Sequence, residues 1–313
     1  IVKKSLSEVF EKGFMKYGQA KGRPIFREIL AKYVSKKFNV KVTNENILVS
    51  PGARFSIFAA ISTLLNPGDE MIVIEPAWPA YKDCALNAGI KVRTISTTLE
   101  TKWEPSIEQI RDTINSNTKM IVLNYPNNPT GKILPEKLQD EVIEVAKKNN
   151  LYVLSDEIYS QYAKTNWKSI LSYNYEKSIV TQSFSKSHAM TGFRVGYAIT
   201  SKQIIEKMAK LEALCLTNVS DPIQFVAMNA LEADTSKNSE IMENRLNMLS
   251  KKAKEMGLEF IIPDGAMYIF AKINEKGFDG VEFANNSLEK GLAVAPGEGF
   301  GNYKNFIRIS ACQ

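Results

Sequence analysis

The chain has 313 residues, of which 44% are apolar and 24% are charged, a composition typical of a globular protein rather than a disordered one. Its formal charge is +6, but the 40 basic residues are interleaved with 34 acidic ones and form no basic stripe, so we expect no nucleic-acid partner. The longest apolar run, residues 55–65, is shorter than the roughly 18 residues of a membrane helix, so we expect no membrane partner.

The cysteine and histidine content narrows the possible chemistry. Cys84, Cys215 and Cys312 are far apart and never in CxxC spacing, which argues against a disulfide framework and favours the reducing cytoplasm. His188 is the only histidine. A histidine-dependent metal site, a Ser-His-Asp triad and a Cys-His pair would therefore all depend on this one residue. We expect no metal site.

Short apolar segments alternate with helical patterns over the first two hundred residues. This alternation is typical of an α/β fold with a mostly parallel, seven-stranded sheet flanked by helices. Ligands of such sheets bind beyond the carboxyl ends of the strands. The predicted strands are 47–49, 71–74, 90–95, 119–123, 151–155, 178–182 and 195–199, and the predicted helices are 53–65, 80–88, 106–116 and 135–149.

The pattern changes after about residue 200, where helices dominate and few strands are predicted. This change indicates a second, smaller α+β unit. We therefore predict a large domain over residues 1–240 and a small C-terminal domain over residues 241–313. The elements predicted there are helices within 202–256, a hairpin or bent strand pair over 261–273, a helix at 280–290 and a last strand at 306–310.

Polar residues follow the predicted strands at their carboxyl ends. Asp156 and Glu157 are adjacent after strand 151–155, and because neighbouring strand residues point to opposite faces, only one of them can face a given ligand. A glycosidase-type carboxylate pair is thereby excluded. Tyr159 shares the face of Asp156 if the chain turns helically there. The stretch NYPNNPTG at 124–131 is stiffened by two prolines and can present an asparagine amide, with a simple turn as an equal alternative.

The stretch SPGAR at 50–54 precedes a predicted helix. The amides of Gly52, Ala53 and Arg54 would be free at the positive end of that helix, which suits a phosphate group. The stretch lacks the lysine and spacing of a P-loop, so we do not expect a nucleoside triphosphate. The glycine pattern GEGFG at 297–301 lacks the strand and helix that flank a dinucleotide fingerprint, so we do not expect a dinucleotide either.

The stretch after strand 178–182 is rich in hydroxyl and basic groups. A phosphate dianion favours a guanidinium, hydroxyls and a helix start, and a desolvated lysine near positive charge becomes a nucleophile toward a carbonyl. Phosphate, aldehyde and lysine together are the chemistry of pyridoxal phosphate (PLP), whose ring nitrogen needs an acid such as Asp156. A solvated polar loop is the other interpretation. The residues concerned are Ser183, Ser185, Lys186, Thr191 and Arg194.

Nine segments, in this order along nearly the entire chain, resemble the PLP-dependent class I/II aminotransferases of fold type I, close to the aspartate aminotransferase group. Any one of them is a weak signal, but their ordered conjunction is highly specific. The segments are KYGQAKGRPIFREIL (16–30), SPGAR (50–54), NPGDE (66–70), EPAWPAY (75–81), NYPNNPTGK (124–132), SDEIY (155–159), SFSKSHAMTGFRVGY (183–197), DGAMY (264–268) and FIRIS (306–310).

The resemblance implies a role for the residues around the cofactor ring. Lys186 is the lysine that joins the cofactor covalently and later moves a substrate proton, and Asp156 keeps the ring nitrogen protonated. Tyr159 and Asn128 hydrogen-bond the ring hydroxyl. Trp78 stacks on the ring.

It also implies how the phosphate and the substrate are held. Ser183, Arg194 and the amides of Gly52, Ala53 and Arg54 bind the phosphate. Arg308 grips the α-carboxylate of the substrate, with Asn128 and Trp78 nearby. Tyr17 is similar to the family tyrosine that reaches the phosphate of the neighbouring subunit, so a homodimer with shared active sites is expected. His188 is expected to serve in packing rather than in catalysis.

Arg54 is the residue that bears most on the substrate. In one branch of the family a basic residue at the position of Arg54 reaches the distal carboxylate of an acidic substrate, which implies aspartate or glutamate with 2-oxoglutarate; the alternative is that only the Arg54 amide is used. Aromatic or alanine transamination, a C–S lyase and a PLP-binding regulator stay open. Members of the family usually begin earlier and continue beyond FIRIS, so we expect the sequence to be a segment of a longer chain.

Overall fold

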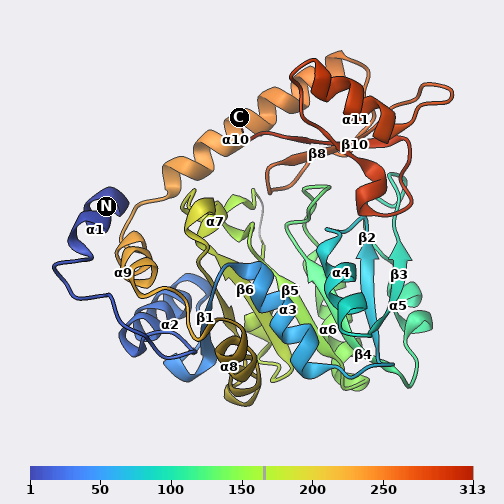
Figure 1. The fold of residues 1–313 in the computed structure, drawn as a ribbon. Coiled ribbons are helices and arrows are strands. Elements are labelled where there is room, and N and C mark those ends of the chain that lie inside the picture. The colour runs from blue at the N-terminus through green and yellow to red at the C-terminus, as the bar shows by residue number, and fades with distance from the viewer. Residues whose placement is uncertain (165–166, 313) are drawn as a thin grey trace.

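The computed structural model describes residues 1–164 and 167–312. Its core is a seven-stranded sheet in the order β1-β7-β6-β5-β4-β2-β3, in which the pairs from β3 to β6 are parallel and β7 is antiparallel to both β1 and β6 (Figure 1). The predicted α/β fold with a mostly parallel seven-stranded sheet is confirmed. The strands are β1 Ile47–Ser50, β2 Glu70–Glu75, β3 Lys91–Ser96, β4 Thr118–Asn124, β5 Tyr152–Asp156, β6 Ser178–Ser183 and β7 Gly196–Ile199.

Helices cover both faces of this sheet because the central strands are apolar on both sides. Met71 and Val73 of β2 pack against one group of helices, whereas Ile72 and Ile74 pack against the other, as the alternation of side chains along a strand requires. The first group is α3 Ala53–Leu64, α4 Ala80–Asn87 and α8 Lys202–Leu216, and the second is α2 Pro24–Phe38, α5 Ile107–Thr113, α6 Glu136–Lys148 and α9 Asp221–Ala230.

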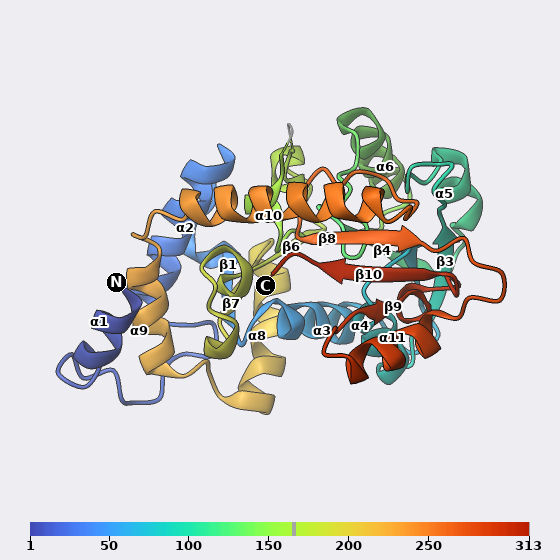
Figure 2. The same cartoon turned by 90° about the horizontal axis from the view of Figure 1, so that it is seen from above.

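A smaller α+β unit lies above the carboxyl ends of the central strands, as Figure 1 shows. Its antiparallel sheet has the order β8-β10-β9, and α10 runs along one side of β8 (Figure 2). The predicted domain boundary at residue 240 falls inside α10, and it stays a prediction. The elements are α10 Ser236–Glu255, β8 Tyr268–Lys272, α11 Gly280–Glu289, β9 Ala295–Pro296 and β10 Phe306–Ser310.

The hairpin or bent strand pair expected over 261–273 does not form within that range. Only β8 is a strand, and its pairing with the preceding chain is limited to one bridge between Glu259 and Lys272. The reason is a competing partner, because the amides of Asp264 and Gly265 both donate to the carbonyl of Gly131 in the large unit, at 2.9 Å. That contact places the two units side by side at the carboxyl ends of the strands.

The two remaining α-helices of the described chain are α1 Val2–Glu8 at the N-terminus and α7 Phe184–Ser187 directly after β6. Five short 3-10 helices lie in its connections, at Asn44–Asn46, Ser160–Tyr162, Ile170–Tyr173, Thr191–Phe193 and Gly297–Phe300. Within the described residues, none of the helices combines the length and the apolar composition that a bilayer crossing requires.

Candidate active site

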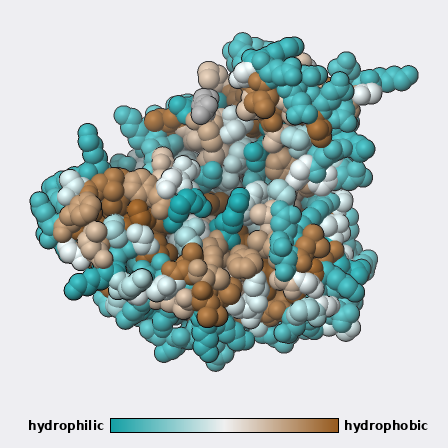
Figure 3. All heavy atoms as spheres, viewed as in Figure 1, coloured by the Kyte–Doolittle hydropathy of each residue, from teal (hydrophilic) through white to brown (hydrophobic). Residues whose placement is uncertain are grey.

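A cavity of about 340 Å³ lies between the two units, where β4, β5 and β6 end. In Figure 3 hydrophilic side chains occupy the hollow between the upper and lower parts of the molecule. The cavity brings together most of the residues that the sequence singled out. Its lining is Ala53, Arg54, Ile57, Trp78, Tyr81, Asn124, Asn128, Asp156, Ile158, Tyr159, Ser183, Ser185, Lys186, Thr191, Arg194, Tyr268 and Arg308.

Asp156, the last residue of β5, is a buried acid in the wall of this cavity. Its Oδ2 accepts a hydrogen bond from the Tyr81 hydroxyl at 2.7 Å, and its Oδ1 accepts one from Thr181 at 3.1 Å. Burial raises the pKa of Asp156, while these hydrogen bonds and the charge of Lys186 act in the opposite direction. A cation placed against the carboxylate would therefore be strongly favoured.

Lys186 lies on the short helix α7, directly after β6. Its Nζ is 5.9 Å from the centre of the Tyr159 ring. The hydroxyl of Tyr159 shares a 2.8 Å hydrogen bond with the hydroxyl of Tyr268, which belongs to β8 of the small unit. Burial raises the pKa of Tyr159 well above its usual value, so this hydroxyl is a neutral donor in the structure as it stands.

The start of α3 forms an anion-binding edge. The amides of Ala53 and Arg54 have no acceptor among the residues that the structure describes, whereas the amide of Gly52 donates to the carbonyl of Ser50 at 2.7 Å. Gly52 has a φ of 86°, and a Cβ there would approach Nη2 of Arg194 to 2.8 Å. A glycine is needed at this point because it lets the guanidinium approach the helix start.

Ser183, at the end of β6, and Arg194, just before β7, approach this edge. The Ser183 hydroxyl accepts a bond from the amide of Ser185 at 3.1 Å and so caps α7. Arg194 is exposed, has a left-handed φ of 52°, and donates through Nη1 to the carbonyl of Thr191 at 2.8 Å. Its Nη2 remains directed at Gly52.

Arg308 of β10 enters the cavity from the small unit. Its guanidinium carbon lies 4.5 Å from the centre of the Tyr268 ring and 5.0 Å from that of Phe300, and Nη1 donates to Oδ1 of Asn128 at 2.8 Å. Nε is buried and, among the described residues, has no acceptor. An unpaired guanidinium nitrogen in a buried place is suited to a carboxylate ligand.

Arg54 and Trp78 also line the cavity and contact each other. The guanidinium carbon of Arg54 lies 4.9 Å from the centre of the Trp78 ring, and Trp78 makes an edge contact with Tyr81. The Arg54 side chain is exposed, so it is free to turn toward an anion at the cavity mouth.

Comparison of the whole chain with known protein families places it in one of them. The family model for aminotransferase class I and II matches residues 2–313. The chain belongs to the class I and II aminotransferases. These are PLP-dependent enzymes.

Three relatives illustrate the match. An aspartate aminotransferase of Thermotoga maritima is 34% identical over 96% of this chain and 80% of its own length. A crystal structure of aspartate aminotransferase from the same organism has a TM-score of 0.94 and 32% identity, and the match covers 99% of this chain and 82% of that chain. The crystal structure of an aromatic aminotransferase from Pyrococcus horikoshii has a TM-score of 0.94 and 30% identity, and the match covers 100% of this chain and 87% of that chain.

Two polar residues next to the aminotransferase site lie outside the cavity. Burial lowers the pKa of His188 to about 4, and its Nδ1 shares a 2.8 Å hydrogen bond with Ser187 while its ring packs on Phe184. Glu157 is buried on the opposite side of β5 from Asp156. Its carboxylate accepts hydrogen bonds from the hydroxyls of Ser155 and Ser169 and from the amide of Ile170. Burial raises the pKa of Glu157 to about 7.

Tyr17 also lies outside the cavity, on the surface of the chain, and is 88% exposed.

Two tyrosines, Tyr81 and Tyr268, line the cavity although neither was predicted as a site residue. Their signal was weak, because each ends a quoted motif, EPAWPAY or DGAMY, in an otherwise apolar context.

Proposed function

We propose that this aminotransferase uses PLP to move an amino group between an L-amino acid, aspartate or glutamate, and a 2-oxo acid such as 2-oxoglutarate. The observation that carries the proposal is the convergence of Lys186, Asp156 and Arg308 on one cavity. The amine of Lys186 suits an aldehyde, and the buried carboxylate of Asp156 suits a protonated ring nitrogen. The guanidinium of Arg308 suits a carboxylate.

The donor groups of the cavity fit the cofactor. The free amides of Ala53 and Arg54, together with Arg194 and Ser183, would hold its phosphate. The buried carboxylate of Asp156 would pair with its ring nitrogen, since a cation offsets the cost of burying that charge. When bound, PLP supplies an electron-accepting ring that stabilises the negative charge left on the substrate Cα after its proton is removed.

The remaining residues orient the ring and move the proton. Tyr159 and Asn128 would donate to the ring hydroxyl, and Trp78 would stack on the ring face. Nζ of Lys186 would hold the cofactor aldehyde and, once substrate is bound, accept the proton from the substrate Cα. A positioned base of this kind contributes on the order of 10²–10⁴-fold to the rate.

Arg308 and Arg54 would select the substrate. The buried Nε of Arg308, which has no acceptor within the described residues, and its Nη atoms would bind the α-carboxylate in a bidentate fork. Arg54 would leave the Trp78 ring to bind the distal carboxylate of aspartate or glutamate. Many of the relatives are aspartate aminotransferases, which supports this assignment.

We also propose that the active enzyme is a homodimer. Tyr17 is 88% exposed and Leu214, near the end of α8, is 86% exposed, which are unusual values for large apolar side chains. Figure 3 shows apolar residues gathered over α1 and α9, on one side of the molecule. A second copy that covers this side would bring Tyr17 to the phosphate of the neighbouring site.

A half-reaction assay tests the function. The protein loaded with PLP is mixed in turn with aspartate, glutamate, phenylalanine and alanine, and the visible absorbance of the cofactor is followed. We expect rapid loss of that absorbance with aspartate and glutamate. Faster reaction with phenylalanine would favour the aromatic alternative. With a thioether amino acid such as cystathionine and no acceptor, release of many equivalents of 2-oxo acid per site would favour a C–S lyase, because a transaminase releases only one equivalent before its cofactor is used up.

The Arg54→Ala variant tests the substrate class. It should slow the half-reaction with aspartate by about 10- to 100-fold and leave the reaction with phenylalanine unchanged, because only aspartate has a distal carboxylate. Arg111→Ala, on the exposed surface of α5, is the matched control. Equal losses with both amino acids would mean that the Arg54 side chain does not read the substrate.

A further inference from the structure

Residues 14–23, the Tyr17 loop, are anchored on both sides of an exposed tyrosine. The amide of Gly18, directly after Tyr17, donates to Oδ1 of Asn218 at 3.2 Å. At the end of the loop the guanidinium of Arg23 donates through Nε and Nη2 to the two carboxylate oxygens of Asp221. Asn218 and Asp221 lie in the sequence between α8 and the first turn of α9.

The pair between Arg23 and Asp221 is more than a surface contact. Asp221 is 3% exposed, and the Arg23 guanidinium is covered by the ring of Phe14, 4.2 Å from its centre. The amide of Arg23 also donates to Oε1 of Gln224 at 2.8 Å. A bidentate pair with a buried carboxylate fixes the geometry of the loop, because loss of one partner leaves the other charge desolvated.

Asn218 is itself held in a fixed orientation. Its Nδ2 donates to the carbonyl of Val219 at 2.6 Å, which turns Oδ1 toward Gly18. The preceding residue, Thr217, has a φ of 67° and a ψ of −61°, a sparsely populated conformation for a β-branched residue. Such strain persists only where the surrounding contacts over-determine it.

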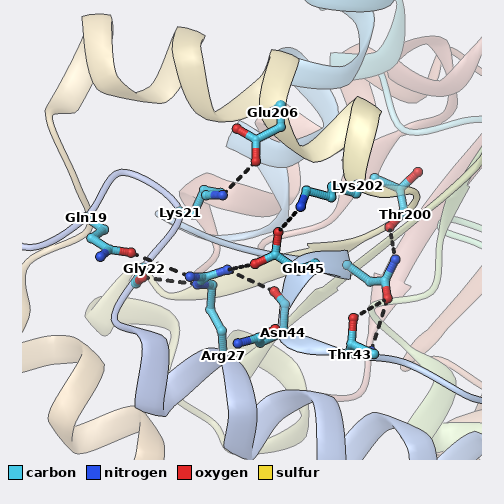
Figure 4. A network of polar contacts seen from close by, with 11 residues as sticks. Gln19, Lys21, Gly22, Arg27, Thr43, Asn44, Glu45, Thr200, Lys202 and Glu206 are labelled. Atoms are coloured by element: carbon cyan, nitrogen blue, oxygen red, sulfur yellow. Dashed lines mark hydrogen bonds and ion pairs between the residues drawn. The ribbon is translucent and has the colours of Figure 1, made fainter.

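The other side of the loop is joined to the strand that leads to the phosphate-binding edge. The amide of Val49 in β1 donates to the carbonyl of Lys21 at 3.1 Å, three residues before Gly52. Figure 4 shows the polar contacts around it, in which Arg27 donates to the carbonyl of Gly22 and Lys21 pairs with Glu206 of α8.

The backbone around Tyr17 is therefore held in place, while Tyr17 itself is 88% exposed. So many contacts around one exposed side chain indicate that its position matters to a second molecule. We propose that Asn218 and Asp221 are positioning residues that present Tyr17 to the cofactor phosphate of the partner subunit. This inference rests on the proposed PLP-binding homodimer.

The variants Asp221→Asn and Asn218→Ala test the proposal without touching the cavity. Each should raise the dissociation constant for PLP about tenfold, as Tyr17→Phe should. The thermal unfolding temperature of the cofactor-free protein should shift little in Asn218→Ala and should fall in Asp221→Asn, because Arg23 there loses its charged partner. Glu240→Gln, an exposed carboxylate on α10, is the matched control and should leave PLP binding unchanged. Site occupancy is measured by borohydride reduction followed by intact mass, which records PLP only on subunits that retain Lys186.

Hybrid dimers separate positioning in trans from a local structural effect. In a hybrid of Asp221→Asn with Lys186→Ala subunits, the only site with a lysine receives its Tyr17 from a subunit with an intact Asp221, so its PLP affinity should return to that of the unmodified dimer. When both substitutions lie in one subunit and its partner is unmodified, the affinity of the remaining site should stay about tenfold weaker.

The opposite pattern would overturn the proposal. If the defect stays with the Asp221→Asn subunit in the first hybrid, Asp221 acts within its own chain. A protein that sediments as a monomer, or that takes up no PLP on borohydride reduction, would instead refute the proposed function, and the positioning role with it.

Discussion

The hydroxyl of Tyr81, in the first turn of α4, donates to Oδ2 of Asp156 across 2.7 Å inside the wall of the cavity. Burial and the negative charge of Asp156 together raise the pKa of Tyr81 well above its usual value, so the tyrosine stays a neutral donor across the physiological range. A neutral donor favours the ionised form of the carboxylate, which is the form that pairs with a cationic ring nitrogen.

The Tyr81→Phe variant should weaken that ionised form. Loss of a hydrogen bond to a charged group costs about 1.5–3 kcal/mol, so we expect the pKa of Asp156 to rise further and kcat/KM to fall about 10- to 100-fold at neutral pH. The acidic limb of the pH–rate profile should move to higher pH. Tyr152→Phe, at the other end of β5, is the control, and an unchanged profile in Tyr81→Phe would show that the hydrogen bond has no part in the reaction.

Lys186→Ala should abolish turnover but not binding. Without Nζ the cavity loses the base assigned to the substrate proton, so we expect kcat to fall by at least about 10²–10⁴-fold. The phosphate-binding groups at Ala53, Arg54 and Arg194 are unaffected, and PLP should still bind in a form that borohydride does not fix to the protein. Lys251→Ala on α10 is the control for loss of a lysine charge. Turnover near the unmodified rate would exclude Lys186 as the base.

Much of the fold followed from the sequence because its signals are local. Each of the seven strands of the large sheet lies within about two residues of a predicted apolar run bounded by turn residues. The central strands are buried on both faces and so read as apolar runs, whereas the edge strand β3 is mostly exposed. The antiparallel direction of β7 was not predictable, since the spacing of apolar residues carries no direction. The failed hairpin at 261–273 had a non-local cause, the hydrogen bonds from Asp264 and Gly265 to Gly131.

The candidate site divides in a similar way. Polar residues in motifs, such as Lys186 and Asp156, were identifiable because their chemistry is unusual at the end of a strand. Tyr81 and Tyr268 were not, because a tyrosine in an apolar stretch is most often a core residue. Their hydroxyls acquire a role only from partners far away in the sequence, 75 residues for Tyr81 and 109 for Tyr268.

Arg308→Lys should separate substrate binding from the chemical step. Lysine keeps the positive charge but cannot form the planar bidentate fork, and Nε of Arg308 is the buried donor that would be lost. We expect KM for the amino acid to rise about 10- to 100-fold with a smaller change in kcat. PLP affinity, measured by absorbance titration, should be unchanged. An unaltered KM would mean that the α-carboxylate binds elsewhere.

Glu212 of α8 provides a prediction for stability rather than for activity. Its side chain is buried, and neither carboxylate oxygen has a hydrogen-bond partner among the described residues. Burial raises its pKa from 4.5 to about 9. A carboxyl group in this position is protonated at neutral pH while the chain is folded and ionised when the chain is unfolded.

The sign of the pH dependence follows from these two values. Below pH 4.5 both states hold the proton and Glu212 carries no penalty. Between pH 4.5 and about 9 only the folded chain holds it, so the free energy of unfolding falls as pH rises, by up to about 1.4 kcal/mol per pH unit. Above about pH 9 both states are ionised and the loss is complete.

Glu212→Gln removes this proton and should flatten the dependence. We expect the variant and the unmodified protein to unfold at similar urea concentrations near pH 5, and the variant to be more stable by about 4 kcal/mol at pH 8, because glutamine stays neutral in both states. Urea unfolding at pH 5, 6, 7 and 8 measures this difference. All samples are kept at one protein concentration, because the apparent stability of a protein that associates depends on its concentration. Glu240→Gln, on the exposed face of α10, should show no such divergence with pH. If the two curves of Glu212→Gln and the unmodified protein stay parallel from pH 5 to 8, then Glu212 is already ionised in the folded chain, and a positive group or water must reach it.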